Sequence, residues 1–354
     1  MSFSKMIFSG LFMFALVMPV AAVAQGYVEV DKGSHKYNRL IEGPLADRIV
    51  WAFDDPGDDS NPLGLLLETL RPARKIVWAS YKPTHPDLVD LLNGHKRAWG
   101  IYDENYCGDC DDAFGGNKKV TAVALGIYSS RSRRKWLVMH HKFAAIDYSK
   151  NKPSGSEAVI AGSFNWNEKA AERNYEDIVR INSRKIAGAF WREYKRIKGK
   201  HAGNPGPVSD GDIEVAFNEH CAPLLARYID AAQKSVHVAV WTISPSSSRK
   251  PNPVYDALVS AMERGVKVRI LTDARKARKR DYGDLDVIRA EMPSRKTHLH
   301  HKFAVIDGKT VITGSYNYVT KALSGNYENV VAINSPAMAT SYSAWWETVR
   351  AALQ

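Results

Sequence analysis

The chain has 354 residues, of which 45% are hydrophobic and 25% are charged, and it carries a formal net charge of +11 at pH 7. This balance excludes a collagen-like, a disulfide-dense or a largely disordered chain, and the length suggests two domains. The excess of Lys and Arg over Asp and Glu favours polyanionic partners such as nucleic acid or acidic lipid headgroups.

Residues 1–24 have the pattern of a secretory signal peptide. One positive charge, at Lys5, is followed by an uncharged and mainly apolar run over residues 6–24, which ends in an Ala-x-Ala sequence just before Gln25. An uncleaved membrane anchor is the alternative, because the run is barely long enough to cross a bilayer. We expect cleavage before Gln25 and export of the mature chain, which is then periplasmic or secreted.

Helical and strand-like segments alternate after this leader. In the first half, Asn61 as N-cap and Pro62 as first residue indicate a helix that runs to Leu70. A helical turn begins at Glu168. Short apolar runs predict strands over residues 76–79, 136–139, 143–146, 158–161 and 178–181.

A segment rich in Gly and Pro then divides the chain. Four of the five residues from Gly203 to Pro207 are Gly or Pro, which is typical of a linker. We therefore predict two domains, residues 25–204 and 205–354, with a boundary near residue 205. The second domain is expected to contain helices over 223–232 and 254–264 and strands over 266–271, 311–313 and 330–333. This alternation predicts a layered α/β fold in each domain.

The second half of the chain repeats the first at several positions. The run His-His-Lys-Phe-Ala-Ala-Ile-Asp recurs with one change, and Gly-Ser-x-Asn and Asn-Tyr-Glu also recur. The paired segments are 140–147 with 300–307, 162–165 with 314–317, and 174–176 with 326–328. Two copies of one α/β unit are the simplest account of this pattern.

Each copy carries half of a potential catalytic site. Residues two apart on a strand point to the same face, so His140 and Lys142 project together. His300 and Lys302 do the same in the second copy. Each copy then adds a Ser and an Asn after a Gly turn, and a Glu further along. Two copies related by a pseudo-twofold axis can join these halves into one pocket.

Such a pocket suits a tetrahedral anion. The ammonium and amide groups can donate to phosphate oxygens, where charge gathers in the transition state. One His can attack phosphorus and form a phosphohistidine, while the other protonates the leaving oxygen and later deprotonates water. A carboxylate on the far ring nitrogen would fix the His tautomer, and Glu176 and Glu328 are the candidates. We expect neither a metal nor a cofactor, since the lysines supply the positive charge.

The pattern His-x-Lys-x4-Asp followed by Gly-Ser-x-Asn, present in both copies, resembles the phospholipase D superfamily. The resemblance implies an α/β fold of two pseudo-twofold-related α/β/α sandwich domains that share one active site. It implies a monomer with no obligate protein partner. It also implies a covalent phosphohistidine, with His140 as the attacking residue.

The resemblance assigns roles to individual residues. The motif residues that it places at the catalytic centre are His140, Lys142, Asp147, His300, Lys302 and Asp307. The residues that it implies for phosphate binding are Ser163, Asn165, Ser315 and Asn317. Within this superfamily the two aspartates tend to be structural partners rather than direct actors at phosphorus.

The residues around the motifs are most similar to the nuclease and cardiolipin-hydrolase branch of this superfamily. Basic clusters at residues 131–135, 275–280 and 295–296 could steer polyanions toward the pocket. We therefore predict an exported, metal-independent phosphodiesterase, with nucleic acid favoured over anionic phospholipid as substrate. One alternative is a phospholipase D that releases headgroups from glycerophospholipids. The other is a noncatalytic polyanion-binding protein.

The remaining Cys, His and Trp residues receive structural interpretations. Cys107 and Cys110 could close a disulfide in an oxidising compartment, which the sequence leaves open. Cys221 is expected to be a buried apolar residue. His141 and His301 are expected to pack on the opposite side of their strands. Four tryptophans are expected in the core or at an interface, namely Trp78, Trp241, Trp345 and Trp346.

Overall fold

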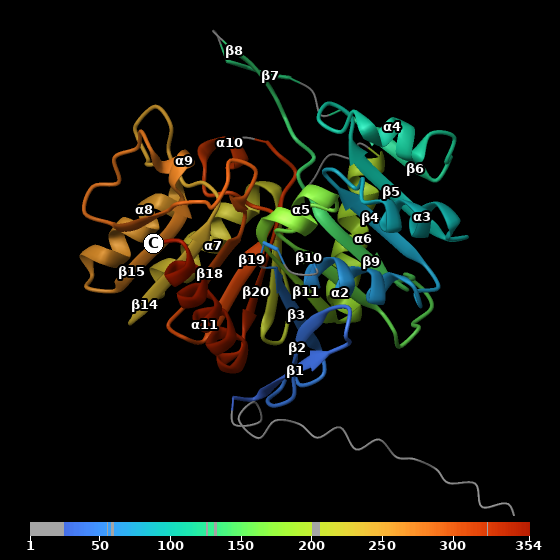
Figure 1. Cartoon of the computed structure of the whole chain (residues 1–354), viewed down its shortest axis with the longest axis horizontal. Coiled ribbons are helices and arrows are strands. Elements are labelled where there is room, and N and C mark those ends of the chain that lie inside the picture. Colours follow the sequence, from blue (N-terminus) through green and yellow to red (C-terminus); the bar gives the residue numbers. More distant parts are fainter. Residues whose placement is uncertain are drawn as a thin grey trace, which may run out of the picture.

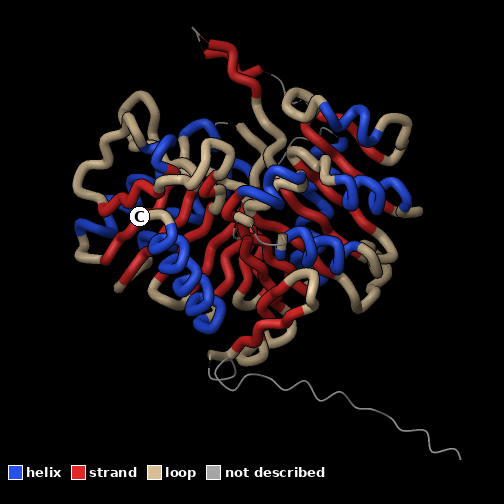
Figure 2. The backbone as a smooth tube through the Cα atoms, viewed as in Figure 1, coloured by secondary structure: helices blue, strands red, loops and turns tan. Residues whose placement is uncertain are grey.

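Two large β-sheets form the centre of the molecule, and helices surround them (Figure 1; Figure 2). The computed structural model describes residues 25–54, 56–57, 60–124, 127–130, 133–199, 206–323 and 325–354. The predicted leader and the predicted domain boundary near residue 205 lie outside these residues.

The first sheet is built almost entirely from the first half of the chain. Its strands are β1 (Tyr27–Asp31), β2 (Lys36–Leu40), β3 (Ile49–Asp54), β4 (Ile76–Ser80), β5 (Ala98–Asp103), β6 (Val120–Val123), β9 (Lys142–Ile146), β10 (Ala158–Gly162) and β11 (Asn174–Asn182). They follow the order β1-β2-β3-β11-β10-β9-β4-β5-β6. The short strand β17 (His298–Leu299), which comes from the second half, pairs in parallel with β11.

The second sheet has a corresponding arrangement. Its strands are β12 (Val208–Asp210), β13 (Ile213–Phe217), β14 (Ser235–Val240), β15 (Lys267–Asp273), β16 (Asp286–Ala290), β18 (Lys302–Ile306), β19 (Thr310–Gly314) and β20 (Asn329–Asn334). The order β13-β20-β19-β18-β14-β15 matches β3-β11-β10-β9-β4-β5 of the first sheet strand for strand. Both motif strands, β9 and β18, therefore occupy a central position in their sheets.

Helices cover both faces of each sheet. On the first sheet, α2 (Asn61–Leu70), α3 (Pro86–Gly94) and α4 (Asp109–Phe114) share one hydrophobic cluster. On the second sheet, α7 (Cys221–Asp230) and α8 (Pro253–Glu263) form the equivalent cluster. The long helices α6 (Arg184–Gly199) and α11 (Pro336–Ala352) contribute to a third cluster between the sheets. None of the described helices is long and apolar enough to span a bilayer.

Shorter elements link these layers. They are β7 (Ile127–Ser130), β8 (Arg133–Trp136), α5 (Glu168–Arg173), the 3-10 turn Asn218–His220, α9 (Ala274–Ala277) and α10 (Thr320–Leu323). The hairpin of β7 and β8 extends away from the rest of the molecule (Figure 1).

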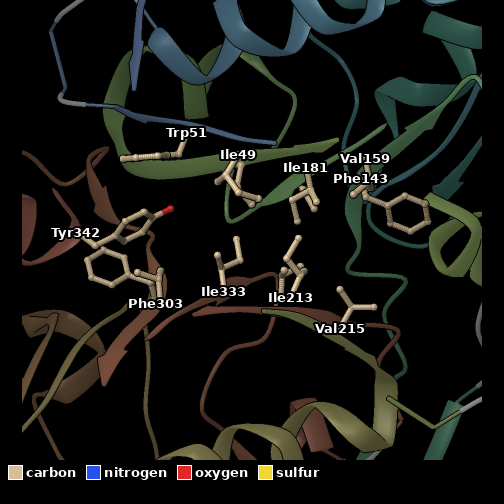
Figure 3. Packing of buried hydrophobic residues seen from close by; sticks show 14 of the residues in the cluster. Ile49, Trp51, Phe143, Val159, Ile181, Ile213, Val215, Phe303, Ile333 and Tyr342 are labelled. Carbon is tan, nitrogen blue, oxygen red and sulfur yellow. The ribbon is translucent and has the colours of Figure 1, made fainter. Parts of the chain in front are cut away.

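One hydrophobic cluster joins the two halves of the chain. Ile49 and Ile181 lie on the first sheet, and Ile213 and Ile333 lie opposite them on the second (Figure 3). All four side chains are fully buried. Burial of one such side chain stabilises a fold by roughly 1.5–3 kcal/mol. The sheets therefore share a continuous core, which fixes the position of one sheet relative to the other.

The start of α2 differs from the sequence prediction. Ser60 is the N-cap residue, and its hydroxyl accepts a hydrogen bond from the Leu63 amide. Asn61 was expected in that role, but its side-chain amide donates to the Phe53 carbonyl instead. Asn61 therefore ties the first turn of α2 to β3.

The three cysteines occupy buried positions. Cys107 and Cys110 form a disulfide at the start of α4. Cys221 is a free thiol that is fully buried, so its expected role as a small apolar core residue is confirmed.

The motif aspartates lie at the far ends of the motif strands from the histidines. Asp307 accepts hydrogen bonds from the backbone amides of residues 233–235 at 2.7 to 2.9 Å. Asp147 makes the same type of contact with the amides of Arg74 and Lys75. Both aspartates have positive φ angles, 54° and 56°. They were grouped with the catalytic motif residues, but they stabilise the turns that precede β14 and β4.

Replacing Asp307 with Ala should lower the free energy of unfolding by about 2 kcal/mol, because hydrogen bonds from three amides to a carboxylate are lost. Asp307→Asn should lower it less, since the amide oxygen still accepts and Asn tolerates positive φ. Urea unfolding at pH 7 measures both. Lys234→Ala is the matched control, because its exposed side chain is removed while its amide stays. Equal stability of Asp307→Ala and the control would contradict the structural role.

Candidate active site

Backbone pairing between the halves brings the two motifs together. The His140 amide donates to the Tyr327 carbonyl at 2.9 Å. The His300 amide donates to the Tyr175 carbonyl at 3.0 Å. The sequence predicted a strand that ends at Met139. In the structure Met139 instead forms an isolated parallel bridge with Tyr327 of the other half. Each histidine is therefore held at the junction of the two sheets.

Each motif histidine receives its carboxylate from the other half of the chain. His140 Nδ1 lies 2.9 Å from Glu328 Oε2. His300 Nδ1 lies 2.9 Å from Glu176 Oε2. All four side chains are buried. The sequence identified both carboxylates as candidates but did not predict this exchange, because it depends on how the two sheets meet.

Two serines hold these carboxylates in place. The Ser163 hydroxyl donates to Glu176 at 2.7 Å and accepts from the Asp177 amide at 2.9 Å. The Ser315 hydroxyl donates to Glu328 at 2.5 Å. The resemblance implied phosphate contacts for both serines, and the structure differs on this point. Each hydroxyl has a single proton, and a carboxylate already engages it.

Two buried lysines complete the centre. Lys142 Nζ donates to the His140 carbonyl at 2.6 Å. Lys302 Nζ donates to the His300 carbonyl at 2.5 Å. Burial lowers the pKa of Lys142 to about 7, although the Glu328 carboxylate opposes this shift. Burial likewise lowers the pKa of Lys302 to about 8. Both amines therefore titrate close to neutral pH.

The two His–Glu pairs differ in protonation. Burial lowers the pKa of His140 to about 4, while Glu328 opposes that shift. Burial raises the pKa of Glu328, but its contacts with His140, Lys142 and Ser315 together outweigh burial, and the pKa ends below its usual value. Burial raises the pKa of Glu176 to about 8 and lowers that of His300 well below its usual range. The two carboxyl groups are therefore shifted in opposite directions, Glu328 toward the ionised form and Glu176 toward the protonated form.

Two asparagines follow tight glycine turns next to this centre. A Cβ atom at Gly162 would collide with the Asp177 carbonyl oxygen, so the close approach of β10 and β11 requires glycine there. Gly314 occupies the equivalent position. The side-chain oxygens of Asn165 and Asn317 are buried, and they have no hydrogen-bond partner among the described residues. Of the two, Asn317 lines the cavity that contains His140.

The second histidine of each motif lies in the core, on the opposite side of the strand from the first. His141 is hydrogen-bonded to Glu193 of α6 at 3.1 Å. His301 lies 3.0 Å from Asp177 and accepts a hydrogen bond from the Trp345 indole at 2.9 Å. Both imidazoles are fully buried. They brace the interface between the halves and do not reach the site.

A cavity of about 430 Å³ opens beside His140, with walls from both halves. Its aromatic, basic and amide lining includes Tyr81, Tyr106, Trp241, Lys276, Arg280, Asn317 and Lys321. The Tyr81 ring lies 5.1 Å from the His140 ring, and the Trp241 ring lies 5.3 Å from the His300 ring. Trp241 was expected in the core or at an interface, but it is a half-buried wall of the cavity. The sequence did contain a signal for this position. Trp241 directly follows β14, just as Tyr81, which also lines the cavity, directly follows β4.

A domain model described as "Cardiolipin synthase, PLD-like domain" matches residues 109–198 and 225–350. The chain is 29% identical over 131 residues to a mitochondrial cardiolipin hydrolase from Chlamydomonas reinhardtii, covering 35% of this chain and 56% of that protein. It is 32% identical over 152 residues to a phospholipase D from Rickettsia conorii, covering 40% of this chain and 72% of that protein. The chain thus spans little more than half the length of the first relative.

The fold is similar to that of a phosphatidylserine synthase from Haemophilus influenzae. The superposition has a TM-score of 0.60 and covers 93% of this chain and 89% of the other, at 12% sequence identity. At this identity the likeness concerns the fold alone.

The His140 imidazole should stay neutral as the pH falls from 7 to 5, because burial lowers its pKa to about 4. Histidine side-chain NMR resonances, assigned by comparison with His140→Ala, measure this directly. In Glu328→Gln the midpoint should move lower still, since the carboxylate that favours the imidazolium is lost. A His140 midpoint near 6.5 in the wild-type protein would contradict this environment.

Proposed function

The chain belongs to the phospholipase D-like family, whose domain model matches more than half of the chain, and we propose that it is a phosphodiesterase that forms a phosphohistidine. The predicted family and the predicted two-domain α/β fold are confirmed. The observation that carries the proposed activity is the meeting of two His–Glu pairs and two buried lysines at one junction.

The different protonation of the two pairs supports different roles for the histidines. An ionised Glu328 accepts the Nδ1 proton of His140, which leaves the Nε2 lone pair free to attack phosphorus. A protonated Glu176 donates to His300 Nδ1, which leaves a proton on Nε2 for the leaving oxygen. The tautomers are assigned from these partners. We therefore propose His140 as the nucleophile and His300 as the general acid.

The reaction then proceeds in two displacements. His140 Nε2 forms a bond to phosphorus as the phosphorus–oxygen bond to the leaving group breaks. His300 gives its Nε2 proton to the departing oxygen, while Glu176 passes its own proton to His300 Nδ1, so that the imidazole stays neutral and Glu176 becomes ionised. In the second displacement His300 accepts a proton from water, whose oxygen attacks phosphorus and releases His140. The same intermediate could pass to an alcohol, but we favour water.

The phosphate itself is held by positive charge and amide donors. Lys142 and Lys302 place two ammonium groups at the junction, where negative charge grows in the transition state. Asn317 lines the cavity that contains His140, and its side-chain NH2 group can donate to a phosphate oxygen; Asn165 is proposed for the same role from the matching motif of the first half. Because these groups provide the charge stabilisation, we propose that turnover requires no metal ion.

Nucleic acid is the substrate that we favour. Basic side chains line the cavity beside His140 together with the Trp241 and Tyr81 rings, and the whole chain carries a net charge of +11. Polyanion backbones and stacked bases suit such a lining. We also propose that the mature enzyme is exported, from the leader pattern of residues 1–24. It would act as a monomer, because one chain supplies both halves of the site.

Release of headgroups from phospholipids is the second candidate function. The printed names of the relatives, cardiolipin hydrolase and phospholipase D, favour it. A noncatalytic polyanion-binding role is the third, and two complete His-x-Lys motifs argue against it.

The mature protein should cleave a phosphodiester substrate in the presence of EDTA, and His140→Ala and His300→Ala should each reduce the rate by at least about 10³-fold. Plasmid DNA and phospholipid vesicles, assayed side by side, identify the substrate. His95→Ala, at the end of α3, is the matched control. Cleavage that needs a metal and survives both motif substitutions would refute the mechanism. Turnover of vesicles without nicking of DNA would select the lipid function.

The value of kcat/KM should fall as the pH rises from 7 to 9. Lys142 and Lys302, with pKa values of about 7 and 8, are charged below these values and lose their protons above them. Loss of either ammonium weakens stabilisation of the phosphate charge. Initial rates on bis(p-nitrophenyl) phosphate at constant ionic strength measure this profile. A rate that is flat or rises over this interval would contradict the role of the lysines.

A further inference from the structure

The two sides of the cavity carry different chemistry at equivalent positions. Strands β5 and β15 end at Asp103 and Asp273, which occupy the same place in their sheets. Three residues later the first half has Tyr106, whose ring lies 5.9 Å from the Tyr81 ring. The second half has Lys276 at that position. The two sides therefore differ at this one position, although Lys82 and Lys321 place ammonium groups 5.5 Å and 5.9 Å from the centres of the Tyr81 and Tyr106 rings.

Lys276 lies close to the catalytic centre. Its ammonium is 4.3 Å from the centre of the Trp241 ring, and the Lys302 ammonium is 6.0 Å from the same ring centre. Trp241 also contacts the His300 ring. One indole thus separates the ammonium that would hold the scissile phosphate from a second ammonium further out. Neighbouring phosphates of one substrate can span such a short distance.

Arg280 lies on the same wall and is held in place by the protein. Its guanidinium donates to the Thr242 hydroxyl at 2.8 Å and to the Ile243 carbonyl. Both Arg280 and Lys276 line the cavity that contains His140. In the part of the chain that the structure describes, no carboxylate forms a salt bridge with either side chain. Their charges are therefore available to an anion in the cavity.

We propose that Lys276 and Arg280 form a subsite for a second phosphate group of the substrate, beside the one that is cleaved. This inference rests on the proposed phosphodiesterase function. Arginine and lysine are the side chains that bind phosphate best, and a guanidinium anchored by the backbone loses little entropy when it does so. Because the equivalent position in the first half is Tyr106, the two sides of the cavity offer this phosphate different contacts, which gives the substrate a direction in the site.

The cation–π contact of Lys276 does not compete with this role. A cation–π contact at a half-buried indole is a weak interaction. The ammonium has three donors, and a phosphate can accept from those that point away from the ring. The contact with Trp241 therefore orients Lys276 for the anion.

Two sources can supply a second phosphate, and the experiment separates them. A polynucleotide carries one on the next nucleotide, and a diphosphate lipid such as cardiolipin carries one across its central glycerol. The nucleotide probes are dithymidine monophosphate and its 5′-phosphorylated and 3′-phosphorylated forms. The lipid probes are vesicles that contain phosphatidylglycerol or cardiolipin. Each set keeps the scissile phosphodiester and varies the second phosphate.

In the wild-type enzyme, one phosphorylated dinucleotide, or cardiolipin, should have a KM at least about tenfold below that of its single-phosphate counterpart, in line with the loss of a charge-assisted contact. Lys276→Ala should reduce that KM ratio to below about twofold, and Lys276→Arg should restore most of it. Arg280→Gln should reduce the ratio in the same direction. Lys279→Ala, an exposed neighbour with the same loss of charge, should keep the wild-type ratio.

Equal KM values within both probe sets would overturn the subsite, as would equal losses in Lys276→Ala and Lys279→Ala. Hydrolysis of bis(p-nitrophenyl) phosphate by the same preparations separates this failure from a failure of the proposed function. If the wild-type enzyme hydrolyses that compound but shows no preference for a second phosphate, only the subsite is wrong. If it hydrolyses neither that compound nor any probe, the phosphodiesterase proposal and the subsite both fall.

Discussion

The exchange of carboxylates between the two halves is the constraint on which the rest of the structure depends. His140 is paired with Glu328, and His300 with Glu176, and all four side chains are buried. A buried ionisable group is costly unless a partner with good geometry compensates it. Neither half can provide that partner alone. The shared core between the sheets and the backbone pairing at Tyr175 and Tyr327 keep both pairs in register.

The geometry of the site is nearly symmetric, but its chemistry is not. Asp177, beside His301, corresponds to Asn329 in the other half, and Glu193, beside His141, corresponds to Trp345. These differences lie in the interface and near the His–Glu pairs. They give the two halves of the site different surroundings, although both halves come from one repeated unit. The two cavity walls also differ from each other. A duplicated scaffold can therefore supply a nucleophile, an acid and a directional binding surface.

Local sequence patterns predicted the elements well where the pattern itself has a physical cause. The helix ending at Leu70 and the strands that carry the motifs follow from N-capping, proline placement and apolar runs. The prediction was wrong for the cap of α2, because Ser60 and Asn61 are both good caps and contacts with β3 decide between them. It was also wrong for Trp241, since a large aromatic residue after a buried strand suits a core as well as a cavity wall.

The sequence by itself determined the family, the α/β class and the contents of each half-site, because a repeated His-x-Lys and Gly-Ser-x-Asn pattern leaves few other chemical uses for those residues. Only the tertiary structure decided which groups meet. Three features depend on distances between separate segments of the chain. Glu328 is the hydrogen-bond partner of His140, the serines bind carboxylates, and Lys276 lies over Trp241. Such distances follow from how the two sheets pack, and short-range sequence patterns do not predict them.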